Sequence, residues 1–172
     1  MTPAPHDAAS LRAAQAPFKE LYREDPAQAI VPVSASASFA EPGITVTVPT
    51  WSEPVRAGLH HKAGGDPADA CSGDMLLEAL LGCVGVTLRS VLTAMSIDVR
   101  AATLTATGQF DMRGTLGVSR DVPVGVTDIE VVAELETDAD DETLAKVGKL
   151  VDRYCVVSRS LAEPARIIVR RA

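Results

Sequence analysis

The three cysteines of this chain are the residues best able to do covalent chemistry. Cys83 lies within the apolar run LLEALLGCVGVTLRS, Cys155 lies in YCVVSRSL, and Cys71 lies in a polar, glycine-rich stretch. A thiolate can act as a nucleophile, and a second thiol can resolve the oxidised sulfur as a disulfide. Free cysteine is also among the most buried residue types, so packing as a small hydrophobe is the alternative for each of them.

Metal binding is a further alternative for the polar stretch before the long apolar run. His60, His61, Asp66 and Cys71 could converge there. Zinc sites usually take their four ligands from close pairs such as CxxC or HxxxH, and the two adjacent histidines do not fit that pattern. We therefore expect the histidine pair to be solvent-exposed, and we expect no metal.

The charge and composition of the chain exclude nucleic acid as a partner. Its 172 residues carry a formal net charge of −7, and only 3% of them are aromatic. No basic stripe is present to neutralise phosphates, and a base-stacking surface would need more aromatic side chains.

The sequence also indicates a cytoplasmic protein that does not enter a membrane. The segment MTPAPHDAASLRAAQ has neither the basic nor the apolar region of a secretory signal. The longest apolar run, around residues 75–95, carries Glu78 and Arg89, which would be costly at membrane depth. Three cysteines in a reducing compartment do not predict a disulfide framework, so buried, metal-binding and catalytic roles remain open for them.

The elements that must position the cysteines follow from periodicity and turn residues. The length suits one domain with a real core, and the mixture of elements predicts an α+β class with antiparallel strands packed on two principal helices. Apolar residues at helical spacing predict helices, and alternation predicts strands. The predicted helices span 8–24, 74–95 and 140–153; the strands span 31–39, 44–51, 99–112, 127–137 and 165–171; a hairpin turn spans 41–43, a long loop precedes residue 74, and a short helical turn lies within 154–164.

The central predicted helix sets the position of Cys83. Its leucines and valines form one stripe, and Cys83 lies about 120° away at 100° per residue, on a side lined mostly by small residues. This predicts a helix buried on more than one face, with a second element close to Cys83. Ser72 or Asp74 is expected to cap its first turn. Cys155 is expected at the start of a helical turn, where free amides would lower its thiol pKa.

Two segments resemble a known family. DMLLEALLGCVGVTLRSVLTAMSI (74–97) and YCVVSRSL (154–161) are similar to the two cysteine motifs of the OsmC/Ohr family, and the order of the elements agrees. The resemblance covers roughly residues 28–172, which leaves 1–27 as an N-terminal helical extension. It implies an OsmC-like α+β fold, an antiparallel sheet with a long buried central helix, in an intertwined homodimer.

The same resemblance implies a function. The best-studied branches of the family reduce organic hydroperoxides, so Cys83 would be the peroxidatic thiol and Cys155 its resolving partner. A dithiol reductant would reset the pair, and no metal or flavin would be needed. The chain would then be a cysteine-based peroxidase of the oxidative stress response.

This sequence departs from the family pattern at several positions. Val156 stands where the family often has proline, and the hairpin tip FAEPGIT lacks the arginine that holds the thiolate in peroxidase branches. Arg56 is the nearest candidate for that arginine, and Asp74 is the candidate for the accompanying acid or else a helix cap. Cys71 is either a spare thiol or a plain loop cysteine. The alternative function is a non-enzymatic dimer of the same fold that binds a small apolar ligand, with structural cysteines.

Overall fold

The computed structural model describes residues 4–40 and 42–172 and contains two three-stranded sheets, ordered β1-β2-β3 and β4-β5-β6. The strands are β1 (Thr45–Val48), β2 (Val55–Gly58), β3 (Ala70–Cys71), β4 (Ala101–Gln109), β5 (Thr127–Glu136) and β6 (Arg166–Arg171). The helices are α1 (Ala8–Glu24), α2 (Ser72–Ala94), α3 (Met112–Thr115), α4 (Asp141–Tyr154) and α5 (Val156–Arg159), with 3-10 turns η1 (Pro26–Ala29) and η2 (His61–Ala63). The α+β class expected from the sequence is confirmed.

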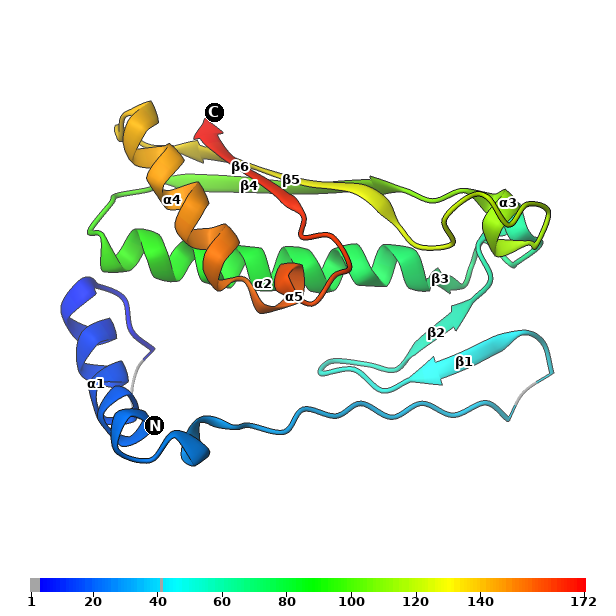
Figure 1. Ribbon diagram of the computed structural model, residues 1–172, viewed down its shortest axis with the longest axis horizontal. Helices are drawn as coiled ribbons and strands as arrows, with labels where there is room; N and C mark the ends of the chain where they lie inside the picture. The colour runs from blue at the N-terminus through cyan, green and yellow to red at the C-terminus, as the bar shows by residue number, and fades with distance from the viewer. Residues whose placement is uncertain (1–3, 41) are drawn as a thin grey trace.

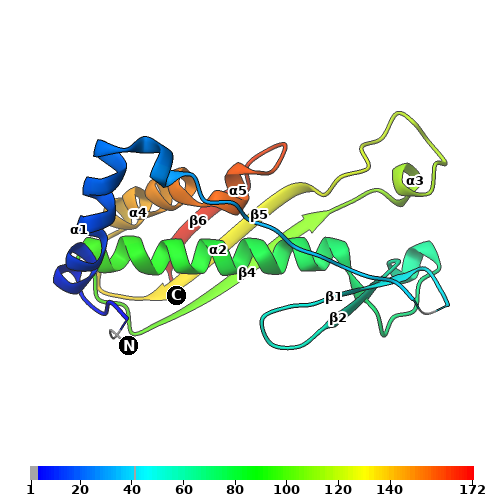
Figure 2. The same cartoon turned by 90° about the horizontal axis from the view of Figure 1, so that it is seen from below.

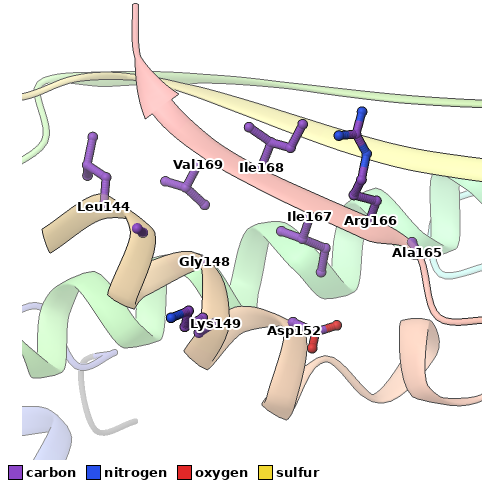
Figure 3. Close-up of a pocket in the computed structure, with 10 residues that line it drawn as sticks. Leu144, Gly148, Lys149, Asp152, Ala165, Arg166, Ile167, Ile168 and Val169 are labelled. Atoms are coloured by element: carbon purple, nitrogen blue, oxygen red, sulfur yellow. The ribbon is translucent and has the colours of Figure 1, made fainter. Parts of the chain in front are cut away.

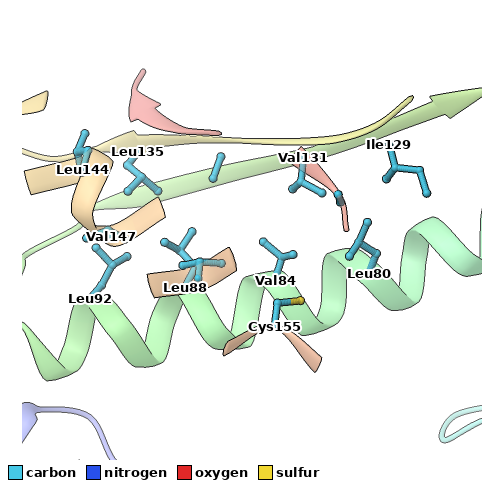
Figure 4. Packing of buried hydrophobic residues seen from close by; sticks show 13 residues of the cluster. Leu80, Val84, Leu88, Leu92, Ile129, Val131, Leu135, Leu144, Val147 and Cys155 are labelled. Carbon is cyan, nitrogen blue, oxygen red and sulfur yellow. The ribbon is translucent and has the colours of Figure 1, made fainter. Parts of the chain in front are cut away.

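The core lies between one face of the β4-β5-β6 sheet and the helices α2 and α4. Alternate residues of β5 point toward these helices, as the period of a strand requires. The buried residues of the two helices recur at spacings of three or four residues, so they lie on one face of each helix and pack against the sheet. Figure 4 shows this cluster, which includes Leu80, Val84, Leu88 and Leu92 from α2, Ile129, Val131 and Leu135 from β5, and Leu144 and Val147 from α4.

The second sheet is mixed, which differs from the antiparallel sheet expected from the sequence. The β4–β5 pair is antiparallel, whereas β6 lies parallel to β5, with Val131 opposite Ile167. The chain between these two strands forms α4 and α5, and a parallel pair needs a crossover connection of this kind. The crossover packs against α2, with α5 beside α2 in Figure 1, and Cys155 stands at the junction of α4 and α5.

The predicted N-terminal hairpin, in which residues 31–39 pair with residues 44–51, is wrong. Residues 31–39 form no strand, and only a single bridge joins Ser38 to Thr47. β1 pairs instead with β2, a strand that the sequence placed at the edge of a long loop. Pro32 supplies no amide hydrogen to a ladder, which disfavours a regular strand there. Glu41, at the start of the predicted turn, lies outside the described residues.

The segment that precedes β1 is extended and uncovered. It runs alongside the β1–β2 layer, below α2 in Figure 1. Val33 is 93% exposed and Phe39 is 82% exposed. The segment therefore presents apolar side chains to solvent in this protomer.

Helix α1 has the bounds predicted from its apolar spacing. Asp7 caps it, because its carboxylate accepts a hydrogen bond from the Ser10 amide at 2.7 Å, and Ser10 reciprocates in a capping box. The helix lies beside the C-terminal end of α2, as both views show (Figures 1 and 2). Its Phe18, Leu21 and Tyr22 remain exposed.

Helix α2 is buried on one face only, not on several faces as expected. Four of its 23 residues are buried, and all four face the sheet. By length and composition alone α2 could cross a membrane, but the core helix of a soluble protein passes the same test. The packing of α2 on the β4-β5-β6 sheet identifies α2 as a core helix.

The start of α2 also differs from the expectation. Cys71 occupies the N-cap position and its side chain makes no capping hydrogen bond, while Ser72 and Asp74 lie inside the first turn. The pairing of β3 with β2 fixes the backbone up to Cys71, so the helix begins where the ladder ends.

Candidate functional site

The fold brings Cys83 and Cys155 together from two elements far apart in the sequence. Cys155 ends α4 and begins α5, and its backbone amide closes α4 by donating to the Val151 carbonyl at 2.9 Å. Its side chain is fully buried, and Figure 4 shows it beside Val84 of α2. Cys83, one residue before Val84, is half-buried and packs against the same cluster.

Four hydrogen-bonding groups surround the Cys83 sulfur. Burial raises the pKa of the Cys83 thiol, but donors that favour the thiolate outweigh it, so the pKa is lowered overall. They are the Val157 amide, the Cys155 thiol, the Val156 amide and the Thr87 hydroxyl. The two amides begin α5, where no preceding helical turn supplies them with a carbonyl partner.

The environment of Cys155 has the opposite effect. Burial raises the pKa of the Cys155 thiol above its ordinary value, and the neighbouring Cys83 raises it further despite an amide hydrogen bond from Ser158. The expectation that the free amides would activate Cys155 is therefore wrong. Amide hydrogen bonds lower the pKa of both thiols, but at Cys155 burial and the neighbouring Cys83 outweigh them, whereas at Cys83 the hydrogen bonds outweigh burial. Cys83 is the better thiolate of the two, and Cys155 is the better proton donor.

Ser158 holds the segment that presents these amides. Its side chain is fully buried, and its hydroxyl oxygen accepts a hydrogen bond from the Ala165 amide at 3.0 Å. This contact ties α5 to the start of β6. Sequence reasoning missed both Ser158 and Thr87, although each stands a short fixed distance from a cysteine, at Cys155 + 3 and Cys83 + 4.

The surface around Cys83 is apolar and open. Val86 is 74% exposed one turn away on α2, and Val156 is 71% exposed at the start of α5. A side chain added at Gly82 would meet no atom within 4 Å. The thiol is therefore accessible from an apolar surface that can accept a ligand or another chain.

The two expected supporting residues lie elsewhere in this protomer. Arg56 on β2 forms an ion pair with Asp69 at 2.5 Å, and the Asp69 side chain is only 4% exposed. Asp74 is exposed in the first turn of α2, where a negative charge favours the helix dipole. Neither is among the groups with the largest effects on the Cys83 thiol.

Cys71 is separate from the cysteine pair. Cys83 follows it by twelve positions along α2, which corresponds to about 18 Å of helix. It lines a cavity of about 390 Å³ together with His60 and Phe110, whose rings meet edge to face. Within residues 4–40 and 42–172, no three His, Cys, Asp or Glu side chains are grouped so that they could hold a metal ion.

A second groove, of about 470 Å³, separates α4 from β6. Figure 3 shows Ile167 and Val169 pointing from the strand toward Leu144 and Gly148 of the helix. The charged side chains around it are Lys149, Asp152 and Arg166. Among the described residues that line this groove there is no cysteine or histidine, so it has none of the chemistry of the thiol pair.

Comparison with solved structures identifies the same fold. An OsmC-like protein of unknown function from Vibrio cholerae aligns with a TM-score of 0.67 at 12% identity, covering 81% of this chain and 99% of the other. An organic hydroperoxide resistance protein from Elizabethkingia anophelis aligns with a TM-score of 0.63 at 15% identity, covering 83% and 96%. OhrB of Bacillus subtilis, also an organic hydroperoxide resistance protein, aligns with a TM-score of 0.54 at 12% identity, covering 81% and 98%.

Comparison of the sequence itself gives the family. No curated protein matches the chain. A family model described as OsmC-like protein matches residues 64–170, which include β3, α2, the β4-β5-β6 sheet except the last residue of β6, and both Cys83 and Cys155. This match spans more than half of the 172 residues, and it agrees with the shared fold. The chain belongs to the OsmC-like protein family.

Proposed function

We propose that the protein reduces organic hydroperoxides, with Cys83 as the peroxidatic thiol and Cys155 as the resolving thiol. The observation that carries the proposal is the packing of α5 against α2, which places Cys83 and Cys155 in one cluster. In this setting the pKa of the Cys83 thiol is lowered and that of the Cys155 thiol is raised. The chain belongs to the OsmC-like family, and two of the similar structures described above are named organic hydroperoxide resistance proteins.

The reaction balances with these two side chains and an external dithiol. The Cys83 thiolate attacks the distal peroxide oxygen, the O–O bond breaks, and the alkoxide leaves and takes up a proton to become an alcohol. Cys83 is now a sulfenic acid. The Cys155 sulfur attacks it, a disulfide forms, and water leaves. A dithiol reductant supplies two electrons and two protons, which restore both thiols.

The surroundings of Cys83 favour an organic substrate. An alkyl or aryl hydroperoxide buries its apolar group against Val86 and Val156 when its peroxide oxygen reaches the sulfur. Hydrogen peroxide has no such group, so the same surface gives it no binding energy. We therefore propose a preference for organic hydroperoxides over hydrogen peroxide.

The proposed protein is a cytoplasmic homodimer, in keeping with the uncovered face of α2 and the exposed segment before β1. Residues 1–27 form a helical extension and residues 28–172 form the family domain. Supporting roles for Arg56 and Asp74 remain predictions, because this protomer engages Arg56 with Asp69 and leaves Asp74 in solvent.

Stopped-flow kinetics of the reduced protein test the function. Cumene hydroperoxide should oxidise Cys83 at least tenfold faster than hydrogen peroxide does, and much faster than an exposed free thiol reacts. Cys83→Ser should abolish the reaction, while Cys155→Ser should leave a sulfenic acid that does not resolve. Cys71→Ser is the matched control and should keep the full rate. If neither peroxide oxidises Cys83 faster than an exposed thiol, the proposal fails.

A non-enzymatic dimer that binds a small apolar ligand is the second candidate. The observation in its favour is that neutral groups, rather than a cationic side chain, make the largest favourable contributions at Cys83 among the described residues. In that case hydroperoxides would oxidise the Cys83 thiol no faster than an exposed free thiol, and the kinetic experiment would show no peroxide-specific rate.

A further inference from the structure

A cavity of about 750 Å³ lies between the start of β5 and the loop that joins α5 to β6, and it is larger than the two cavities described above. Its walls are residues 123 and 125–130, the loop residues 161–164, Leu76 of α2 and Arg166 of β6. No cysteine or histidine is among the described residues that line it. The cavity therefore lies outside the thiol pair, and a ligand bound there needs none of the thiol chemistry.

The floor of this cavity is apolar and belongs to the core. Ile129 is only 9% exposed, and Val126 and Leu161 pack against the same core cluster. Leu76 adds a fourth apolar side chain from α2. Side chains of a packed core hold their positions, so the floor is formed before any ligand arrives. A ligand with an apolar body gains binding free energy by burying that body here.

The rim of the cavity carries more negative than positive charge. Its charged side chains are three carboxylates and one guanidinium: Asp128, Glu130, Glu163 and Arg166. Arg166 forms an ion pair with Glu130, so these two charges offset each other. Within residues 4–40 and 42–172, no Lys, Arg or His side chain forms an ion pair with Asp128 or Glu163. Two carboxylates therefore remain to attract a cation and to repel an anion.

Asp128 is held at this rim by an irregularity in the β4–β5 pair. Between the partners of Thr107 and Gln109, two residues of β5 stand opposite Gly108 alone, which is a β-bulge. Asp128 has a φ of 52°, a left-handed conformation that is uncommon outside glycine but that aspartate tolerates. The side-chain amide of Gln109 donates a hydrogen bond to the Asp128 carboxylate at 2.5 Å. This neutral donor fixes the carboxylate and leaves its charge in place.

We propose that this cavity binds an organic cation, an amine whose ammonium group meets the carboxylate rim of Asp128 and Glu163 while its apolar body covers the floor. The site goes beyond the proposed reduction of hydroperoxides, because it uses neither Cys83 nor Cys155. The two carboxylates disfavour an anion of the same shape, and a neutral molecule gains only from the floor. The occupant therefore follows from charge complementarity combined with an apolar lining.

Isothermal titration calorimetry of the reduced full-length protein tests the site with three probes that share one apolar body: 4-phenylbutylamine, 4-phenylbutanol and 4-phenylbutyrate. The amine should bind about tenfold more tightly than the alcohol, because a hydrogen bond to a charged group is worth more than one between neutral groups. The anionic 4-phenylbutyrate should bind more weakly than the alcohol. Ethylamine has the charge without the apolar body, so it should show no saturable binding at millimolar concentration.

The double variant Asp128→Asn with Glu163→Gln removes both charges, and asparagine also tolerates the left-handed backbone at that position. It should weaken binding of the amine about tenfold. Its binding of the alcohol should stay unchanged, which shows that the cavity is intact. The charge-matched control is Glu20→Gln with Glu53→Gln, two exposed residues that do not line the cavity. The control should keep the full affinity for the amine, which separates the site from the formal net charge of −7.

Three results would overturn the inference: no binding of the amine at millimolar concentration, equal affinities for the amine and 4-phenylbutyrate, or an equal loss in the double variant and its control. Binding needs no peroxide, so Cys83→Ser should bind the amine as tightly as the unchanged protein. A protein that binds the amine as expected but does not react with hydroperoxides would contradict the peroxidase and leave the role of the cavity intact.

Discussion

At the scale of residues, Cys83 and Cys155 have the same side chain, but their thiol pKa values shift in opposite directions because their surroundings differ. Cys83 and Cys155 were both predicted as candidate site residues from their two motifs, and the protomer places them in contact. The resemblance to the OsmC/Ohr family implied Cys83 as the reactive thiol, whereas the free amides near residue 155 pointed to Cys155. The local sequence could not decide between them, because it does not show which sulfur is fully buried. Thr87 was not found either, since a threonine on an apolar helix suggests packing until its neighbour is known.

The opposite pKa shifts predict different pH dependences for the two thiols. The thiolate reacts and the thiol does not, so alkylation speeds up as pH rises through the pKa. Cys83, with its lowered pKa, should reach half its maximal alkylation rate at a lower pH than a cysteine in an unstructured peptide. Cys155, with its raised pKa, should need a higher pH. Peptide-resolved alkylation of the folded protein measures both, and a Cys83 midpoint at or above that of the peptide would contradict the site described above.

At the scale of elements, local patterns predicted helices well and strand partners poorly. The bounds of α1 and α4 follow from periodicity and caps within the helix itself. The partner of β1 is β2 rather than the segment 31–39, and this pairing depends on contacts that no single segment contains. The parallel β5–β6 pair was missed for the same reason. Helix α5 matters most, because it presents the amides that face Cys83.

Ser158 should therefore stabilise both the fold and the site. Ser158→Ala leaves the buried Ala165 amide without its partner, which should cost about 1–3 kcal/mol of the free energy of unfolding. Ser160→Ala is the control, because Ser160 is exposed and its hydroxyl donates only to the Val156 carbonyl of its own turn. Its effect should stay within about 0.5 kcal/mol. Urea unfolding with unchanged m-values measures both, and equal losses in the two variants would contradict the role of Ser158.

At the scale of the whole molecule, the proposed homodimer would cover apolar surface that the protomer leaves exposed. One face of α2, the apolar side of α1 and the segment before β1 all face solvent. The resemblance to the OsmC/Ohr family implied an intertwined homodimer, and a second copy would cover the central helix on its free face. The sequence predicted that α2 is buried on more than one face. In the protomer only one face is buried, and the proposed dimer would bury a second one.

Light scattering coupled to size exclusion tests this assembly. The expected mass is 36.0 kDa, twice the 18.0 kDa of one chain. Val86→Lys places a charge on the exposed face of α2 and should shift the protein toward the monomer, because burying an unpaired charge is costly. Val118→Lys, at a similarly exposed valine outside α2, should leave the mass unchanged. A wild-type mass of 18.0 kDa at micromolar concentration would contradict the dimer.

The central claim is that Cys83 and Cys155 form one redox pair, and disulfide mapping tests it most directly. The reduced protein is treated with one equivalent of cumene hydroperoxide, remaining thiols are alkylated, and the peptides are analysed without reduction. The account predicts a single Cys83–Cys155 disulfide, with Cys71 still alkylated. A protein that keeps all three cysteines alkylated, or that links Cys71 to either of the others in place of the pair, would contradict it.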